Sequence, residues 1–275
     1  MLAARQAVSS PGGKTPGIDG KVFENSIDSY IEIAIKPREV TDFPKTYKAS
    51  PVKRVMVPKG PGSTEKRPLG IPTIFDRAVQ ALYLYRLLPI AELRADKGSF
   101  GFRKGMGTRD ASIALKNAMV KVPRPQLIFD ADISKFFDNV SHSWLIENVP
   151  MDKDILRAIL TSEAMVNGVI EATEKGFPQG GIISPMLGNL TLDGLERVVK
   201  EPFLKYKGIL PKVNVIRYAD DFIITGPSLR WCFDDTIVPN CTKFLKERGL
   251  NIHPVKSRII DPYVDSFDFL GSQYK

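Results

Sequence analysis

The sequence has little of what zinc-binding scaffolds and disulfide-linked secreted proteins are built from. It contains only two cysteines and two histidines among 275 residues. Cys232 and Cys241 are nine positions apart, a spacing that matches no zinc motif. His142 and His253 are far apart and stand in no metal-binding pattern. So few cysteines favour a reduced compartment inside a cell over a secreted disulfide framework.

Long apolar runs are also missing. No run approaches the roughly 18 residues that a membrane-spanning helix requires, and the N-terminus lacks the apolar core of a secretion signal. No repeats or low-complexity segments occur. With 43% hydrophobic and 25% charged residues, the composition is that of an ordinary globular protein with no membrane partner.

Positive charge is abundant and unevenly placed. The net charge is +8. Between Lys36 and Arg67 there are nine Lys or Arg residues against three Asp or Glu residues. Such a concentrated excess favours a polyanionic partner, and nucleic acid is the commonest one. We expect the contact to include Lys45, Lys48, Lys53 and Arg54.

The segment Tyr218–Asp221 lies between two apolar runs, Val213–Ile216 and Phe222–Thr225. Two β-type runs separated by so few residues predict a tight hairpin. Asp220 and Asp221 would then stand at its tip, where a pair of fixed carboxylates suits a hard cation such as Mg²⁺. Two solvated turn residues are the plainer reading of an isolated Asp-Asp pair.

A second acidic segment, Leu127–Asp138, argues against that plainer reading. It begins as a strand, and the two-residue period puts Asp130 and Asp132 on one face. A carboxylate at the end of a buried strand is costly unless it is paired or bound to metal. If this strand lies beside the hairpin, three carboxylates converge as in a two-metal site for phosphoryl transfer.

Between the acidic segments lies a glycine-rich loop, Gly176–Gly181, followed by Ser184-Pro185. The glycines would let the backbone approach a ligand closely. Ser184 and Pro185 predict a helix start, and we expect the helix to run to about Lys200, with Pro202 ending it.

Taken together, these segments resemble the reverse transcriptases encoded by group II introns, the maturases. The resemblance covers nearly the whole chain, and its motifs follow the order of that family. The matching segments are Gly17–Gly20, Lys53–Lys59, Arg67–Thr73, Asp76–Arg77, Phe100–Arg103, Asp132, Pro178–Gly181, Arg217–Asp221, Asn251–Lys256 and Phe269–Gly271.

The resemblance implies an α+β fold: the fingers and palm of a right-hand polymerase, with an antiparallel palm sheet and packed helices. We expect a mobile segment at 1–20, fingers over 21–125 and palm over 126–275, ending at the start of the primer grip with the thumb absent. Helices are predicted near 23–35, 73–93, 108–121 and 239–248. Strands are predicted at 52–57 and near 67–71, and Asn167-Gly168 predicts a further hairpin.

The resemblance also implies RNA-directed DNA synthesis with two Mg²⁺ ions. Asp132 and Asp220 would hold both ions, with Asp221 and the carbonyl of Ile133 completing the ligands. Other residues would contact the deoxynucleoside triphosphate and the template. These are Lys59 and Arg67 at the triphosphate, Phe137 under the sugar, Gln179 and Gly180 beneath the nucleotide, and Lys256 at the leaving phosphate.

The expected partners are an intron RNA template, a DNA or RNA primer and deoxynucleoside triphosphates, in a bacterial cytoplasm or an organelle. Self-association, the intron and the host stay open. The competing functions are another bacterial reverse transcriptase (of retron, diversity-generating or phage-defence type), a non-catalytic RNA-binding splicing scaffold, and an RNA-dependent RNA polymerase. Phe137 argues against the last, and the three carboxylates argue against the scaffold.

Overall fold

The computed structural model describes residues 1–58, 60, 62–120, 127–204 and 213–274. The chain forms two compact units, each assembled from two stretches. Unit 1 comprises Met1–Ile90 and Phe137–Leu187, and unit 2 comprises Ala91–Phe136 and Gly188–Lys275. The division predicted from the sequence, fingers over 21–125 and palm over 126–275, stays a prediction.

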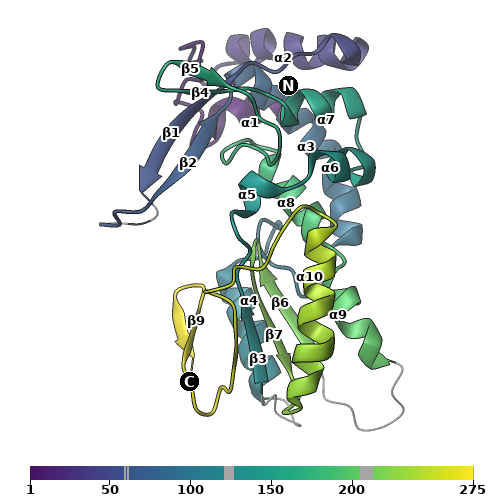
Figure 1. Ribbon diagram of the computed structural model, residues 1–275. Coiled ribbons are helices and arrows are strands. Elements are labelled where there is room, and N and C mark those ends of the chain that lie inside the picture. Colours follow the sequence, from purple (N-terminus) through teal and green to yellow (C-terminus); the bar gives the residue numbers. More distant parts are fainter. Residues whose placement is uncertain (59, 61, 121–126, 205–212, 275) are drawn as a thin grey trace. The chain divides into compact units, whose positions relative to one another are not determined.

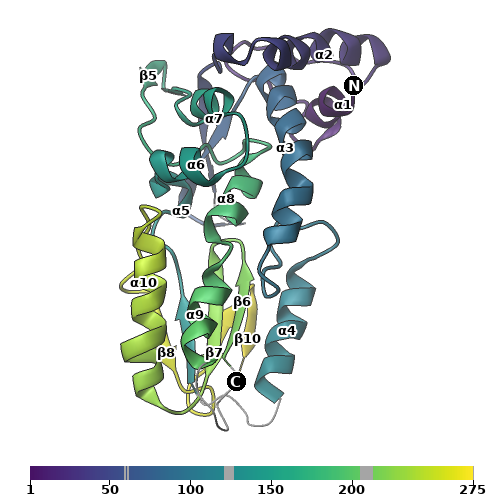
Figure 2. The ribbon, with the colours of Figure 1, turned by 90° about the vertical axis from the view of Figure 1, so that its right-hand side faces the viewer.

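Unit 2 is built on an antiparallel sheet with the strand order β6-β7-β3-β8. The strands are β6 (Asn214–Tyr218), β7 (Asp221–Gly226), β3 (Leu127–Ala131) and β8 (Arg258–Ile260). Helix α4 (Thr108–Val120) lies on one side of the strands and α10 (Val238–Lys246) on the other, as Figure 2 shows. Helix α9 (Leu195–Leu204) packs against α10 and β6.

The core under α4 follows from the alternation of side chains along the strands. Ala111 and Leu115 of α4 meet Ile128, Ile216 and Ile223, all of them buried. A small hairpin of β9 (Phe267–Phe269) and β10 (Ser272–Tyr274) adds aromatic rings to the same cluster. The carboxylates predicted at the ends of β3 and β7 are thus carried by strands anchored in a packed core.

Unit 1 contains a mixed sheet with the order β2-β1-β4-β5. The predicted pair, β1 (Val52–Pro58) and β2 (Lys66–Ile71), is antiparallel and forms the arm visible in Figure 1. The predicted Asn167-Gly168 hairpin joins β4 (Ala164–Val166) to β5 (Val169–Glu171). Both turn residues have positive φ, 51° and 86°, as a type I′ turn requires. The parallel pairing of β1 with β4 has no local signal.

Three helices of unit 1 come from the N-terminal part of the chain. They are α1 (Leu2–Ser9), α2 (Ile27–Asp42) and α3 (Ile74–Arg94), the last of which continues into unit 2. Ala4, Ala7 and Val8 of α1 are buried against Ile33 and Ile74. The mobility predicted for residues 1–20 stays a prediction, and the structure places α1 within that segment.

Shorter elements complete unit 1 and lead into unit 2. They are η1 (Pro44–Thr46), α5 (Phe136–Asn139), α6 (His142–Asn148), α7 (Lys153–Leu160) and α8 (Ser184–Leu192). Within the described ranges, no helix is both long and apolar enough to cross a membrane.

The helix predicted from Ser184 to about Lys200 needs correction. The helix that starts at Ser184 does not run to Lys200, because it breaks at Gly194, whose φ is +96°. Asp96 accepts hydrogen bonds from the backbone N–H groups of Gly194 and Glu196, so α9 begins anew there. Pro202 lies inside α9 rather than after it.

The helix predicted near 239–248 is α10, and it is preceded by a π-helical turn, η2 (Cys232–Ile237), which the sequence did not indicate. Its end was predicted correctly. Gly249 has a φ of +78°, and the N–H of Leu250 reaches back to the carbonyl of Leu245 at 2.9 Å, as in a glycine-terminated helix.

Candidate active site

The predicted tight hairpin is formed by β6 and β7. Tyr218 pairs directly with Asp221, so only Ala219 and Asp220 make the turn. Ala219 has a φ of +58°, a left-handed conformation that is costly for a residue with a Cβ. The turn therefore presents Asp220 at the tip and Asp221 as the first residue of a buried strand.

Strand β3 lies beside this hairpin, as the sequence argument required. It pairs with β7 in a register that matches Ala131 with Phe222 and Asp130 with Ile223. Asp132 follows one position beyond, at the same end of the sheet as Asp221. Both strands deliver their carboxylates to this end because antiparallel neighbours place the end of one strand beside the start of the other.

The backbone at Asp132 is fixed by the segment after α10. Asp132 accepts a hydrogen bond at its carbonyl from the N–H of His253 at 2.8 Å, and its own N–H donates to Ser257 Oγ at 3.1 Å. Ile133 forms a bridge with Ile252. His253, which the sequence left without a role, contributes its backbone here.

The carboxylates perturb one another's ionisation. Burial, followed by the negative charges of Asp130, Asp220 and Asp132, raises the pKa of Asp221 to about 7. Burial also raises the pKa of Asp220, and the charge of Asp132 adds to that shift. Upward pKa shifts caused by burial, with neighbouring like charges adding to them, are typical of functional sites.

These carboxylates suit a hard divalent cation by the chemistry of their oxygens. Positive charge among them would relieve the repulsion that raises the pKa of Asp221. In the described part of the chain, no group of three or more His, Cys, Asp or Glu side chains is already arranged to hold a metal ion. The fit therefore rests on donor chemistry and mutual repulsion.

Two cations from the C-terminal segment approach the carboxylates of Asp130, in β3, and Asp132, directly after it. Lys256 Nζ lies 3.2 Å from Asp132 Oδ2, and Arg258 Nε lies 3.9 Å from Asp130 Oδ2. Burial raises the pKa of Asp130, and Arg258 opposes that shift. Lys256 thus lies close to Asp132, and its predicted role toward a leaving phosphate stays a prediction. Asp130 pairs within the sheet, further from the hairpin tip than Asp132.

Behind the hairpin, the side chain of Arg217 is buried, with 1% of its surface exposed. It contacts Asp193, Asn189 and the carbonyl of Ala219. Sequence reasoning missed Asn189 and Asp193 as members of this site. Arg217 itself was the signal that a buried partner exists, because an arginine within an apolar strand needs a buried acceptor. Its position in the strand does not identify that acceptor.

The other predicted site residues lie in unit 1. Phe136, at the end of unit 2, is buried, whereas Phe137 is only partly buried and meets Phe177 edge to face at 5.5 Å between ring centroids. This difference in burial is the one expected if Phe136 packs in the core and Phe137 is available to a ligand.

The glycines of the Pro178–Gly181 loop serve the protein's own backbone. The N–H of Gly70 in β2 donates to the carbonyl of Gln179 at 2.6 Å. A Cβ at Gly180, whose φ is +115°, would lie 2.7 Å from the carbonyl oxygen of Gly70. The close approach that these glycines permit is therefore to β2, and contacts of Gln179 and Gly180 with a nucleotide stay a prediction.

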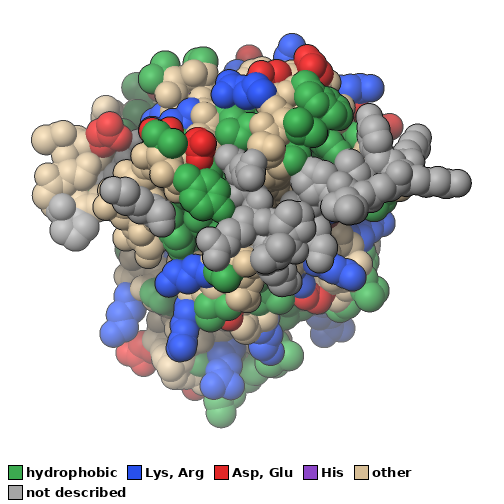
Figure 3. Space-filling model, turned by 90° about the horizontal axis from the view of Figure 1, so that it is seen from below, with side chains coloured by type: hydrophobic (Ala, Val, Ile, Leu, Met, Phe, Trp, Pro, Cys, Tyr) green, Lys and Arg blue, Asp and Glu red, His purple; other side chains and the backbone are tan. Residues whose placement is uncertain are grey.

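The predicted basic contact residues of unit 1 are all exposed: Lys45, Lys48, Lys53 and Arg54. Arg54 approaches Glu171 at 3.8 Å, with both side chains open to solvent. Arg67 is also exposed, on β2, and Lys59 lies outside the described residues. On the face seen in Figure 3, Lys and Arg side chains are interspersed with acidic and hydrophobic ones.

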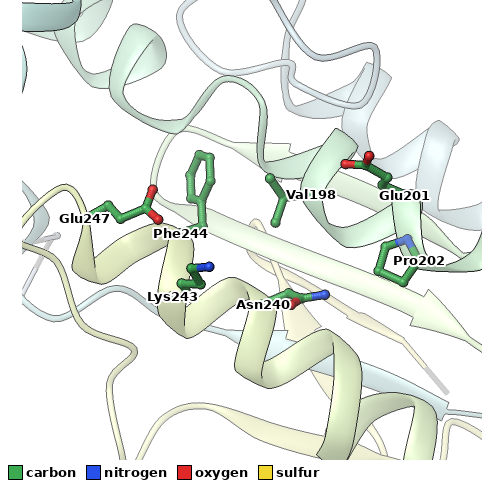
Figure 4. A pocket seen from close by; sticks show the side chains of 7 residues that line it. All are labelled: Val198, Glu201, Pro202, Asn240, Lys243, Phe244 and Glu247. Atoms are coloured by element: carbon green, nitrogen blue, oxygen red, sulfur yellow. The ribbon is translucent and has the colours of Figure 1, made fainter.

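A separate pocket of about 720 Å³ lies between α9 and α10 (Figure 4). Side chains from the two helices line it: Val198, Glu201, Pro202, Asn240, Lys243, Phe244 and Glu247. None of the predicted site residues contributes to it.

Comparisons with known proteins place this geometry in context. The model of the family described as reverse transcriptase (RNA-dependent DNA polymerase) matches residues 57–274. Protein YkfC of Escherichia coli is 28% identical over 303 residues, which cover 98% of this chain and 78% of that protein. The group II intron-encoded protein LtrA of Lactococcus lactis is 31% identical over 225 residues, covering 80% of this chain and 36% of LtrA.

Among solved structures, telomerase from Candida albicans, in complex with a fragment of telomeric RNA, matches with a TM-score of 0.58 at 14% identity. The match covers 89% of this chain and 48% of that one, and it concerns the fold alone. The mixed α/β architecture with antiparallel sheets, the resemblance to group II intron-encoded proteins and the enzyme class predicted from the sequence are confirmed. The chain belongs to the reverse transcriptase (RNA-dependent DNA polymerase) family.

Proposed function

We propose that this chain synthesises DNA on an RNA template as the polymerase of a group II intron. The observation that carries the proposal is the set of coupled carboxylates at the β6–β7 hairpin, where the pKa of Asp221 is raised to about 7. Such a set suits the transfer of a nucleotidyl group, because divalent cations held by the carboxylates would stabilise the negative charge on the attacking and leaving oxygens. The match to LtrA supports the intron assignment.

In the proposed reaction, a primer 3′ oxygen attacks the α-phosphorus of a deoxynucleoside triphosphate and pyrophosphate leaves. Asp132, Asp220 and Asp221 would hold two Mg²⁺ ions together with the carbonyl of Ile133. Bound there, the ions would supply Lewis acidity to the attacking oxygen and charge neutralisation to the leaving group.

The chain's own cations and aromatic ring would orient the substrate. Arg67 and Lys59 would bind the triphosphate, Arg67 through its forked donors. Phe137 would exclude a 2′-hydroxyl, Gln179 and Gly180 would support the nucleotide and template, and Lys256 would neutralise the leaving phosphate. The exposed cations of the basic region (Lys45, Lys48, Lys53 and Arg54) would hold RNA by its phosphates.

The same RNA surface would serve intron splicing, because binding the intron RNA is common to both tasks. A primer-extension assay separates the catalytic proposal from a scaffold. The purified chain receives an RNA template with an annealed DNA primer, deoxynucleotides and Mg²⁺, in parallel with the Asp220→Asn variant. Extension by the wild type alone supports the proposal. Tight RNA binding without extension by either protein would favour the splicing scaffold.

A further inference from the structure

Arg217 occupies the opposite face of the hairpin from the carboxylate of Asp221. It pairs with Phe222 across the sheet, whereas Tyr218 pairs with Asp221, and neighbouring residues on a strand face opposite sides. With only 1% of its surface exposed, the guanidinium must find its partners inside the protein. The partners of the Arg217 guanidinium therefore indicate the role of this buried charge.

One arm of the guanidinium neutralises the charge. Arg217 Nη2 donates to Asp193 Oδ1 at 2.6 Å, and both side chains are almost fully buried. This pair alone would meet the electrostatic requirement of a buried cation. The hydrogen bonds of the other guanidinium nitrogen, Nη1, are therefore not needed for charge neutralisation.

The second arm is directed at the hairpin turn. Arg217 Nη1 donates to the carbonyl of Ala219 at 3.1 Å and to Asn189 Oδ1 at 3.2 Å. Asn189 Nδ2 in turn donates to the carbonyl of Gly101 at 2.8 Å. We call Arg217, Asn189 and Asp193 the Arg217 clasp.

The segment reached by Asn189 packs directly on the same turn. The N–H of Phe100 donates to the carbonyl of Arg217, and the N–H of Arg217 donates to the carbonyl of Gly98, both at 2.8 Å. A Cβ on Gly101 would lie 2.3 Å from the backbone nitrogen of Ala219, so only glycine permits this approach. The clasp thus holds the turn from one side while the Gly98–Gly101 segment lies against it.

The turn needs such support because Ala219 has a φ of +58°. A residue with a Cβ stays in that region only where its surroundings over-determine its conformation, and such strain clusters at functional sites. Asp220 follows directly, so a change at Ala219 would move its carboxylate relative to Asp132 and Asp221.

We propose that Arg217 and Asn189 are positioning residues that fix the Ala219 turn, so that Asp220 and Asp221 are presented together to bound Mg²⁺. The proposal rests on the proposed function of these carboxylates. Neither residue touches the substrate, and each acts through the backbone of the turn. The rival explanation is that the clasp contributes only to the stability of unit 2.

Asn189→Ala tests this inference, because it removes the link to Gly101 and one partner of Arg217 while leaving the Arg217–Asp193 pair intact. The matched control is Asn214→Ala, which deletes an asparagine hydrogen bond to Thr225 at the other end of the same hairpin. Two quantities are measured for each protein: the kcat and nucleotide KM of primer extension, and the melting temperature as a function of Mg²⁺ concentration.

For Asn189→Ala we expect kcat to fall about 10- to 100-fold with little change in KM, since small misplacements of reacting groups have effects of that size. The Mg²⁺ concentration that gives half of the thermal shift should rise several-fold. The melting temperature without Mg²⁺ should stay close to that of Asn214→Ala, which should behave as the wild type in both assays.

Arg217→Lys provides a second variant in case Asn189→Ala does not fold. Lysine keeps the charge that Asp193 needs, but its single ammonium group lacks the fork that reaches Ala219 and Asn189. We expect the same loss of kcat and of Mg²⁺ response.

Wild-type kcat and Mg²⁺ response in either folded variant would overturn the inference, as would a loss of activity fully explained by a smaller folded fraction. A wild type that responds to Mg²⁺ but extends no primer would remove the proposed function, while the thermal shifts would still decide about the clasp. A wild type without any Mg²⁺ response would overturn the inference itself.

Discussion

Charged residues are used in opposite ways at the hairpin of unit 2 and in the basic region of unit 1. Asp220, Asp221 and Arg217 are held in or near the core, and each is constrained by a neighbouring charge or a hydrogen bond. Lys45, Lys48, Lys53 and Arg54 are exposed. Buried charges are costly and need partners in fixed positions. Exposed charges attract a polyanion without holding it in one fixed position. Chemistry is therefore expected in unit 2 and salt-sensitive RNA binding in unit 1.

The largest effect should come from Asp220→Ala. Losing this carboxylate should reduce primer extension by on the order of 10³-fold or more. Folding should be preserved, because burial and Asp132 already disfavour the charged form of Asp220. Extension rates and thermal unfolding would be measured side by side. Wild-type extension by this variant would contradict the assignment of Asp220 to the active site. Comparing Asp130→Ala with Asp132→Ala would decide which of these two carboxylates belongs to the site.

Phe137→Ala should show that unit 1 also contributes to substrate choice. Phe137 is expected to select between ribonucleotides and deoxynucleotides without taking part in the chemistry. Incorporation of ribonucleotides relative to deoxynucleotides should rise by roughly 10²-fold, since the excluded 2′-hydroxyl gains room. Phe136→Ala is the matched control. It should lower the free energy of unfolding by about 3–5 kcal/mol, because Phe136 is buried. Relaxed selection in Phe136→Ala alone would move the selecting residue one position earlier.

Asp221→Asn should stabilise the metal-free protein at alkaline pH. The pKa of Asp221 in the folded state, about 7, exceeds its ordinary value of 3.8, so its ionisation lowers stability as the pH rises through that interval. Asparagine mimics the protonated form. The free energy of unfolding should therefore rise by up to about 4 kcal/mol above pH 7, with no gain below about pH 4. Urea unfolding at several pH values in a chelator would measure it. A gain in the free energy of unfolding that does not depend on pH would show that ionisation of Asp221 does not destabilise the fold.

The smallest effect should be a change in salt dependence. Replacing Lys45, Lys48, Lys53 and Arg54 with Ala should flatten the slope of log affinity for RNA against log salt, by up to about 3 if all four contact phosphates. An equal loss of charge on unit 2 would serve as control: Lys97, Lys116, Lys243 and Lys246 to Ala. If the control flattens the slope and the first variant does not, the RNA surface lies in unit 2.

Much of the candidate site was predictable because its signals are local. The turn at Ala219-Asp220, the strand that carries Asp132 and the glycine end of α10 each depend on a few adjacent residues. The break at Gly194 was missed because it depends on Asp96, far away in the sequence. The partners of Arg217 and the parallel pairing of β1 with β4 likewise depend on tertiary contacts. The backbone that Gly180 approaches closely is that of β2, and its contact with a nucleotide stays a prediction.

The division of labour between the two units is tested most directly by measuring RNA affinity and extension rate on the same proteins. Wild type, Asp220→Ala and the four-residue basic variant of unit 1 would be compared at low and at saturating RNA. Asp220→Ala should bind RNA as the wild type does and extend nothing. The basic variant should bind RNA weakly and regain the wild-type rate once RNA saturates. Equal losses of affinity in both variants, or no recovery at saturation, would contradict this division.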